Sequence, residues 1–195
     1  MHITINNLTI HSHGAPSLAS MLGNALASAA LNARQADQQA ATDAPSYRPV
    51  IGQEWPGQGG IYAGDFRGGD GSVYGLIVAP EQDIGRARWA PNGERDLSDW
   101  DGLANTKRLR TDCPAAKLAS EYQRDGHTDF YLPARRELML AAANVPDKFG
   151  KEDWYWTSTP HDTDCAWAVD FEDGDAVYAS RDDERYFRPF RRFIY

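Results

Sequence analysis

The sequence is poor in cysteine and contains no long apolar run, and each deficit excludes a class of protein. Only Cys113 and Cys165 occur in the 195 residues, with no Cys-x-x-Cys pair and no histidine at zinc-finger spacing. A structural zinc site is therefore not expected. No stretch approaches the roughly 20 apolar residues of a membrane-spanning helix, and no signal peptide opens the chain. The sequence predicts no membrane insertion and no export, and it favours two buried thiols over a disulfide.

Positive charge is also scarce, with 20 Lys and Arg against 28 Asp and Glu, a net charge of −8. Nucleic-acid binders draw most of their affinity from cations that neutralise phosphates, so no nucleic-acid partner is expected. Aromatic side chains, in contrast, are abundant: 6 Trp, 9 Tyr and 7 Phe stand in a chain that is 42% hydrophobic. This composition is typical of a folded globular protein.

Recognisable catalytic motifs are missing as well. The chain has no Gly-x-Ser-x-Gly and no His-Glu-x-x-His, and the glycine-rich segment 68–71 lacks the lysine of a phosphate-binding loop. We therefore expect no enzyme and no catalytic residues. His11 and His13 would share one strand face and form a metal site only in a symmetric trimer, so exposed histidines are the favoured interpretation.

The pattern of the chain divides it into an N-terminal arm, residues 1–45, and a domain, residues 46–195. Alternating apolar residues near the N-terminus predict a short strand or hairpin, and residues 40–49 are typical of a linker. Between them, a helix from Leu18 to about Gln39 carries an apolar stripe without a partner in the arm. The stripe consists of Leu18, Met21, Leu22, Ala25, Leu26 and Ala29.

The domain mixes strands and helices without βαβ alternation, which predicts an α+β fold. Two strands, 59–64 and 73–78, flank the glycine-rich turn. Residues 82–111 show little periodicity. Helices are predicted at 113–122, with Asp112 as N-cap and Pro114 at the first position, and at 135–144. Three strands follow, at 166–171, 176–180 and 187–194.

Three segments resemble a known family in combination: Gly126–Leu138 (GHTDFYLPARREL), Trp154–Thr159 (WYWTST) followed by Trp167 and Phe171, and Phe187–Phe193 (FRPFRRF). They are similar to the phage and bacterial family typified by the C-terminal domain of the Legionella collagen-like adhesin. The resemblance implies a C-type lectin-like fold, also used by formylglycine-generating enzymes and phage receptor-binding proteins. That fold has two helices flanking a small twisted antiparallel sheet, with its N- and C-terminal strands paired.

Most residues of these segments are expected to be structural. Glu137 falls in the first turn of a helix, where a carboxylate is favourable. Arg188 is expected to be buried and to pair with Glu137 or with Asp129, since a buried guanidinium needs a bidentate acceptor. Trp156 and Trp167 are assigned to the core, Trp167 sharing one strand face with Val169 and Phe171.

The resemblance also implies a binding surface, in the loop after the second segment and in the strands before the terminal arginines. Carried to this sequence, the ligand-binding residues are His161, Asp162, Asp164, Tyr178, Ser180, Asp182, Asp183 and Tyr186. Tyrosine, serine and aspartate suit recognition. The same carboxylates, together with Asp173, Asp175 and Glu184, leave calcium open as an alternative to a solvated acidic face.

The resemblance implies a phage or prophage virion protein with a lectin-like surface, which we expect to bind a host cell-surface receptor, glycan or protein, at a tail fibre or baseplate. Other virion proteins would be its assembly partners. Two alternatives stay open: a structural protein of the tail or fibre tip without receptor contact, and an intracellular phage protein that binds a host defence factor.

The first testable prediction concerns the arm. An isolated helix of this length is marginal in water, so its stripe needs a partner, and we expect a homo-oligomer, most simply a homotrimer. Sedimentation at micromolar concentration should show an oligomer that becomes monomeric when residues 1–45 are deleted. A full-length chain that sediments as a 21.7 kDa monomer would contradict the prediction and favour docking of the helix on its own domain.

Overall fold

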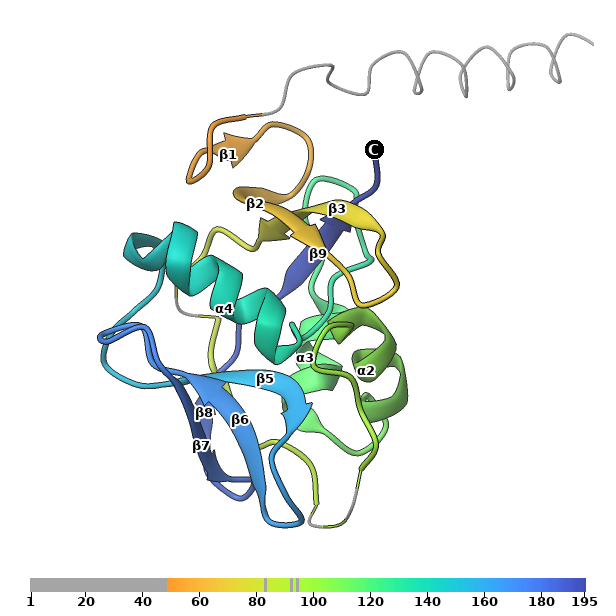
Figure 1. Cartoon of the computed structure of the whole chain (residues 1–195), viewed down its shortest axis with the longest axis vertical. Coiled ribbons are helices and arrows are strands. Elements are labelled where there is room, and N and C mark those ends of the chain that lie inside the picture. Colours follow the sequence, from red (N-terminus) through yellow and green to blue (C-terminus); the bar gives the residue numbers. More distant parts are fainter. Residues whose placement is uncertain (1–48, 83, 92, 94) are drawn as a thin grey trace, which may run out of the picture. The chain divides into compact units, whose positions relative to one another are not determined.

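The computed structural model describes residues 49–82, 84–91, 93 and 95–195. This part of the chain contains two sheets, largely antiparallel, and three α-helices, which confirms the α+β prediction (Figure 1). The predictions for residues 1–45, including the stripe and the His11/His13 pair, lie outside the described residues. None of the described helices has the length and apolar character needed to cross a bilayer.

The first sheet joins the beginning of the domain to its end. Its centre is the hairpin that the sequence predicts, whose turn contains Gly71 at a φ of +86°, a conformation that glycine adopts without strain. The third strand of this sheet pairs antiparallel with the strand at the C-terminal end, Val78 lying opposite Phe190. The strand order is β1 (Glu54–Trp55), β2 (Gly60–Arg67), β3 (Val73–Val78) and β9 (Phe190–Phe193).

The second sheet is built mostly from the C-terminal third of the chain. Within the described residues, one parallel pair of this sheet joins Tyr155 to Tyr186, and the other pairs are antiparallel. The predicted strand 176–180 has the observed bounds, and it forms one edge of this sheet. The strand order is β4 (Arg86–Ala87), β8 (Arg185–Tyr186), β5 (Tyr155–Pro160), β6 (Cys165–Val169) and β7 (Ala176–Ser180).

Three α-helices and a short 3-10 helix, η1 (Pro146–Lys148), complete the domain. The helix α4 (Arg135–Asn144) has the predicted bounds and contacts β2, β5 and β6, so it connects the two sheets. The helix α3 (Pro114–Glu121) starts at the predicted proline, but its N-cap is Cys113 rather than Asp112. The helix α2 (Gly102–Leu109) was not predicted; Asp101 caps it by accepting from the Ala104 amide at 2.9 Å.

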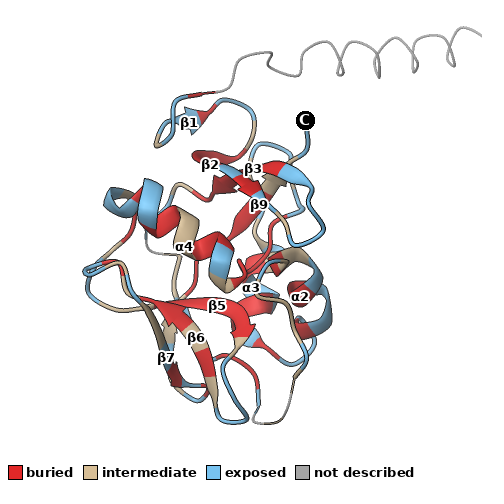
Figure 2. Ribbon diagram, in the orientation of Figure 1, coloured by how far each residue is buried: buried red, intermediate tan, exposed pale blue. Residues whose placement is uncertain are grey.

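The core lies between the sheets and the helices. Buried residues gather on β2, β3, β5 and β6 and on the inner side of α4 (Figure 2). Phe149 and Phe171 stack with ring centroids 3.8 Å apart, and Tyr155 meets both rings edge-on. Trp156 is fully buried, as predicted, and its indole N–H donates to the Ala87 carbonyl at 2.8 Å. This aromatic packing provides much of the apolar burial that stabilises the domain.

The prediction for Arg188 is half correct. The residue is fully buried, but neither Glu137 nor Asp129 accepts from it. Its guanidinium donates instead to the carbonyls of Ala79 at 2.7 Å and Lys148 at 2.9 Å and lies over the Phe149 ring. Burial lowers the pKa of Arg188 to about 10. The carboxylate-pairing assignment was wrong because β9 places other arginines opposite the two acids.

The assignment of Trp167 to the core was also wrong. On β6 the buried side chains are Ala166 and Ala168, so Trp167 points to the opposite face of the sheet and is half-buried there. The Arg135 guanidinium covers this indole at 4.5 Å from the ring centroid. Val169 lies on the same face of β6 as Trp167, but it is buried because α4 covers that end of the strand.

Both cysteines are free thiols, Cys113 fully buried and Cys165 only half-buried, so the prediction of two buried thiols is correct for one of them. Burial raises the pKa of Cys113 to about 12, and burial together with the nearby Asp162 and Asp164 raises the pKa of Cys165 as well.

We expect a disulfide-exchange reagent at pH 8 to label Cys165 in the native protein and Cys113 only after denaturation, because the reagent reaches only Cys165 in the folded domain. The variant Cys165→Ser should then show no native labelling. Rapid labelling of two thiols in the native protein would contradict this.

Candidate functional site

The structure places one buried carboxylate at the junction of four segments. Glu137, in the first turn of α4, is fully buried and accepts from the backbone amides of Ala134 at 2.8 Å and Gly102 at 3.1 Å. The hydroxyls of Tyr74 and Tyr131 each donate to it at 2.9 Å. Four hydrogen bonds of this kind fix the carboxylate in one position.

The cation opposite Glu137 is Arg192 of β9. Its guanidinium donates to Glu137 at 2.9 Å and to Asp101 at 2.8 Å, and Nε donates to the Tyr131 hydroxyl at 3.2 Å. Burial raises the pKa of Glu137, and the Arg192 cation opposes that shift. Although burial lowers it, the pKa of Arg192 is raised above its ordinary value because Tyr131 and Glu137 surround the guanidinium. Arg192 is therefore a fixed, permanently charged donor.

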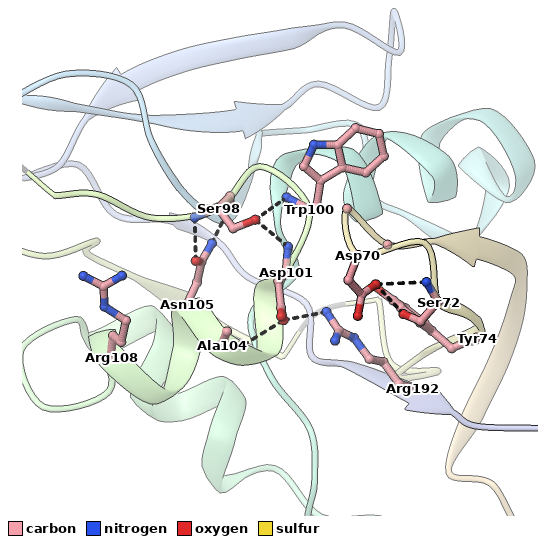
Figure 3. A pocket seen from close by; sticks show the side chains of 12 residues that line it. Asp70, Ser72, Tyr74, Ser98, Trp100, Asp101, Ala104, Asn105, Arg108 and Arg192 are labelled. Atoms are coloured by element: carbon pink, nitrogen blue, oxygen red, sulfur yellow. Dashed lines mark hydrogen bonds and ion pairs between the residues drawn. The ribbon is translucent and has the colours of Figure 1, made fainter.

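Arg192 forms part of the wall of a polar pocket of about 310 Å³. One side of the pocket is the β2–β3 turn, the other is α2 with the loop that precedes it, and Arg192 lies between Asp70 and Asp101 (Figure 3). The volume is at the lower end of the range for ligand pockets, about 300–1,000 Å³. The lining residues that carry polar side chains include Asp70, Ser72, Ser98, Asp101, Asn105 and Arg108.

The pocket offers both kinds of hydrogen-bonding group at its rim. Asp70 is exposed and accepts from the amide and the hydroxyl of Ser72, and these bonds lower its pKa. It is therefore ionised at neutral pH and keeps a second carboxylate oxygen for a ligand. Arg108 donates to the Asp96 carbonyl at 2.6 Å at the edge of α2. Acceptors and donors so close together suit a small molecule that carries several hydroxyl groups.

Trp100 forms the side of the pocket that faces α4. The Arg136 guanidinium lies over its indole at 4.1 Å from the ring centroid. On the turn, Gly69 lies beside this indole, and a Cβ there would be 3.4 Å from it, an ordinary van der Waals distance. Trp100 is thus packed between the turn and α4.

Five of the predicted ligand-binding residues come together at one end of the second sheet. The imidazole of His161 stacks on Tyr178 with centroids 4.3 Å apart. Asp162 accepts from the amides of Asp164 and Cys165 and from His161, and these bonds lower its pKa. Ser180 lies opposite Cys165 in the ladder. The loop is held from beneath by buried Arg181, which donates to the Asp162 carbonyl, so these side chains form an ordered surface.

The other three predicted residues are placed differently. Asp182 is an exposed loop residue, whereas Asp183 forms an ion pair with Arg185 at 2.9 Å. Tyr186 stacks on Tyr155 at 5.2 Å and is covered by Arg86 at 4.4 Å, so it is half-buried and its ring is used for packing. The structure therefore brings together only part of the predicted surface.

The predicted acidic residues do not form a recognisable calcium site in the described part of the chain. In the described part of the chain, no three His, Cys, Asp or Glu side chains are arranged so that they could hold a metal ion. Asp162, the best placed of the predicted acids, already accepts three hydrogen bonds within its own loop.

Sequence reasoning missed the pocket entirely. Two signals for it were present: the glycine-rich turn that contains Asp70, and the third arginine of the terminal segment, Arg192. Neither signal indicates a site alone, because the opposite wall consists of α2 and its N-cap Asp101, and the sequence did not predict that helix.

Comparisons with known proteins add no family. No protein-family model matches the sequence, and a search of curated proteins finds no match.

The central ion pair gives a prediction about stability. We expect Glu137→Gln to lower the free energy of unfolding by about 3–5 kcal/mol, because it leaves Arg192 with only the partly exposed carboxylate of Asp101 and turns an amide NH₂ toward the donors. Urea denaturation measures this. The matched control Glu121→Gln, on an exposed i,i+4 pair of α3, should change it by less than about 0.5 kcal/mol. A loss below about 1 kcal/mol for Glu137→Gln would contradict the assignment.

Proposed function

We propose that the chain is a recognition module of a phage or prophage particle, with a C-type lectin-like domain, and that the polar pocket beside Arg192 binds a hydroxyl-rich ligand such as a glycan of the host surface. The observation that carries the ligand assignment is the pocket itself. A preformed cavity of about 310 Å³ joins a fixed cation to two carboxylates, those of Asp70 and Asp101.

The chemistry of the pocket supports this ligand class. Sugar hydroxyls both donate and accept, so each can use a carboxylate oxygen and an arginine N–H at once. The Glu137 contacts hold Arg192 in place before a ligand arrives, so little ordering entropy is lost on binding. A purely anionic ligand would be repelled by Asp70 and Asp101.

The lectin-like and virion parts of the proposal rest on the sequence resemblance. One feature of the domain supports the resemblance: a strand early in the domain pairs with the C-terminal strand β9. The described residues form three α-helices and two sheets, however, and not the expected two helices and one sheet. Mass spectrometry of purified particles tests the location directly. Absence of the chain from the particles would overturn the virion role and favour the intracellular alternative.

A glycan array of bacterial surface polysaccharides tests the ligand. We expect Asp70→Asn to weaken binding by at least about tenfold, because hydrogen bonds to a charged acceptor contribute about 1.5–3 kcal/mol. Asparagine can still accept from Ser72, so the turn should remain folded. The matched control is Asp173→Asn, an exposed residue of the β6–β7 turn outside the pocket, which should bind as the parent does. Equal binding by all three proteins would contradict the pocket, and no binding to any glycan would contradict the ligand class.

A further inference from the structure

Among the described strands, β7 is the edge of the second sheet, and its outer backbone groups pair with no other strand. The ladder between β6 and β7 continues at both ends, where the Arg181 amide donates to the Asp164 carbonyl at 3.0 Å and the Asp170 amide donates to the Asp175 carbonyl at 2.9 Å. Hydrogen-bonded pairs alternate along an antiparallel ladder, so Val177 and Ala179 bond to β6. The N–H and C=O of Tyr178 therefore point away from β6, beyond the last strand of the sheet.

The side chains along this edge are apolar where an added strand would contact them. Tyr178 is 56% exposed and lies beside Trp167, its partner on β6. Farther along, Ala176 borders a groove of about 490 Å³ whose apolar lining residues are Phe66, Trp100, Met139 and Leu140. Arg135 and Arg136 also line the groove, and their guanidinium groups cover the Trp167 and Trp100 rings. A strand paired with β7 would therefore contact one exposed aromatic ring and the apolar residues of the groove on the same face of the sheet.

Acidic residues stand at both ends of β7. Glu172, Asp173 and Asp175 precede the strand, and Asp182 and Glu184 follow it; none of the five forms an ion pair within the described residues. In an antiparallel pair of two β7 strands about Tyr178, the leading acids of one copy would face the trailing acids of the other. Like charges so placed disfavour a second copy as the occupant.

We propose that β7 binds an extended segment of another protein by β-strand addition. The segment carries β-branched or aromatic residues at its centre and Lys or Arg at both ends. The outward N–H and C=O of Tyr178 provide the ladder hydrogen bonds, the groove beside Ala176 takes an apolar side chain, and the acidic ends select a basic segment. This site shares Trp100 with the wall of the polar pocket but uses none of the polar groups of that pocket, and it does not depend on the glycan assignment.

The test uses two pools of synthetic peptides and the immobilised full-length chain. Both pools share a randomised five-residue centre of Val, Ile, Thr, Phe and Ser; one has Lys and Arg at both ends, and the other has Asp and Glu. We expect retention of the basic pool at least tenfold above the acidic pool, decreasing as salt is raised. Equal retention of the two pools, or none, overturns the proposal.

Two variants at one position separate backbone pairing from side-chain contact. Tyr178→Pro removes the outward N–H and leaves the β6–β7 ladder intact, because proline is tolerated on an edge strand where its nitrogen faces solvent. Tyr178→Thr removes the same ring and keeps the N–H. We expect Tyr178→Pro to retain the basic peptides at least tenfold less well than Tyr178→Thr.

Equal retention by the two variants overturns strand addition. Sedimentation of the full-length chain identifies the competing occupant: if Tyr178→Pro, but not Tyr178→Thr, lowers self-association, a second copy occupies the edge and the proposal is wrong.

Discussion

The ion pair between Glu137 and Arg192 is the constraint on which the rest of the domain depends. The carboxylate binds the first residue of α2, the N-terminus of α4 and the hydroxyls of Tyr74 and Tyr131, so one group orients both helices against the first sheet. The same pair fixes the cation of the polar pocket. Fold stability and pocket geometry therefore have a common origin, and a substitution at Glu137 affects both.

Local patterns in the sequence were sufficient for elements whose signals are local. The bounds of α4, β3 and β7 follow from apolar spacing and from the turn residues beside them. The helix α2 could not be found in this way, since its two leucines are six residues apart. Its buried polar residues Asn105 and Thr106 bond to Ser158 and Leu132, partners that only the tertiary fold supplies.

The arginines of the terminal segment show the same limit of sequence-based prediction at the candidate functional site. The resemblance pointed to a buried arginine, and burial of Arg188 is correct. Which arginine meets which acid depends on the register of β9 against β3 and Tyr131, and alternation along one strand does not contain that information. Arg191 therefore pairs with Asp129, and Arg192 with Glu137. The pocket was missed for the same reason, because its walls come from three separate segments.

The late position of β9 also affects how the chain folds during synthesis. Glu137 and Arg192 are 55 residues apart in the sequence. The separation between β3 and its second neighbour, β9, is larger still. Until residues 190–193 leave the ribosome, the carboxylate lacks its cation and one edge of β3 is open. Contacts between such distant residues form late and slowly, so the nascent domain stays incomplete until synthesis has passed its last strand.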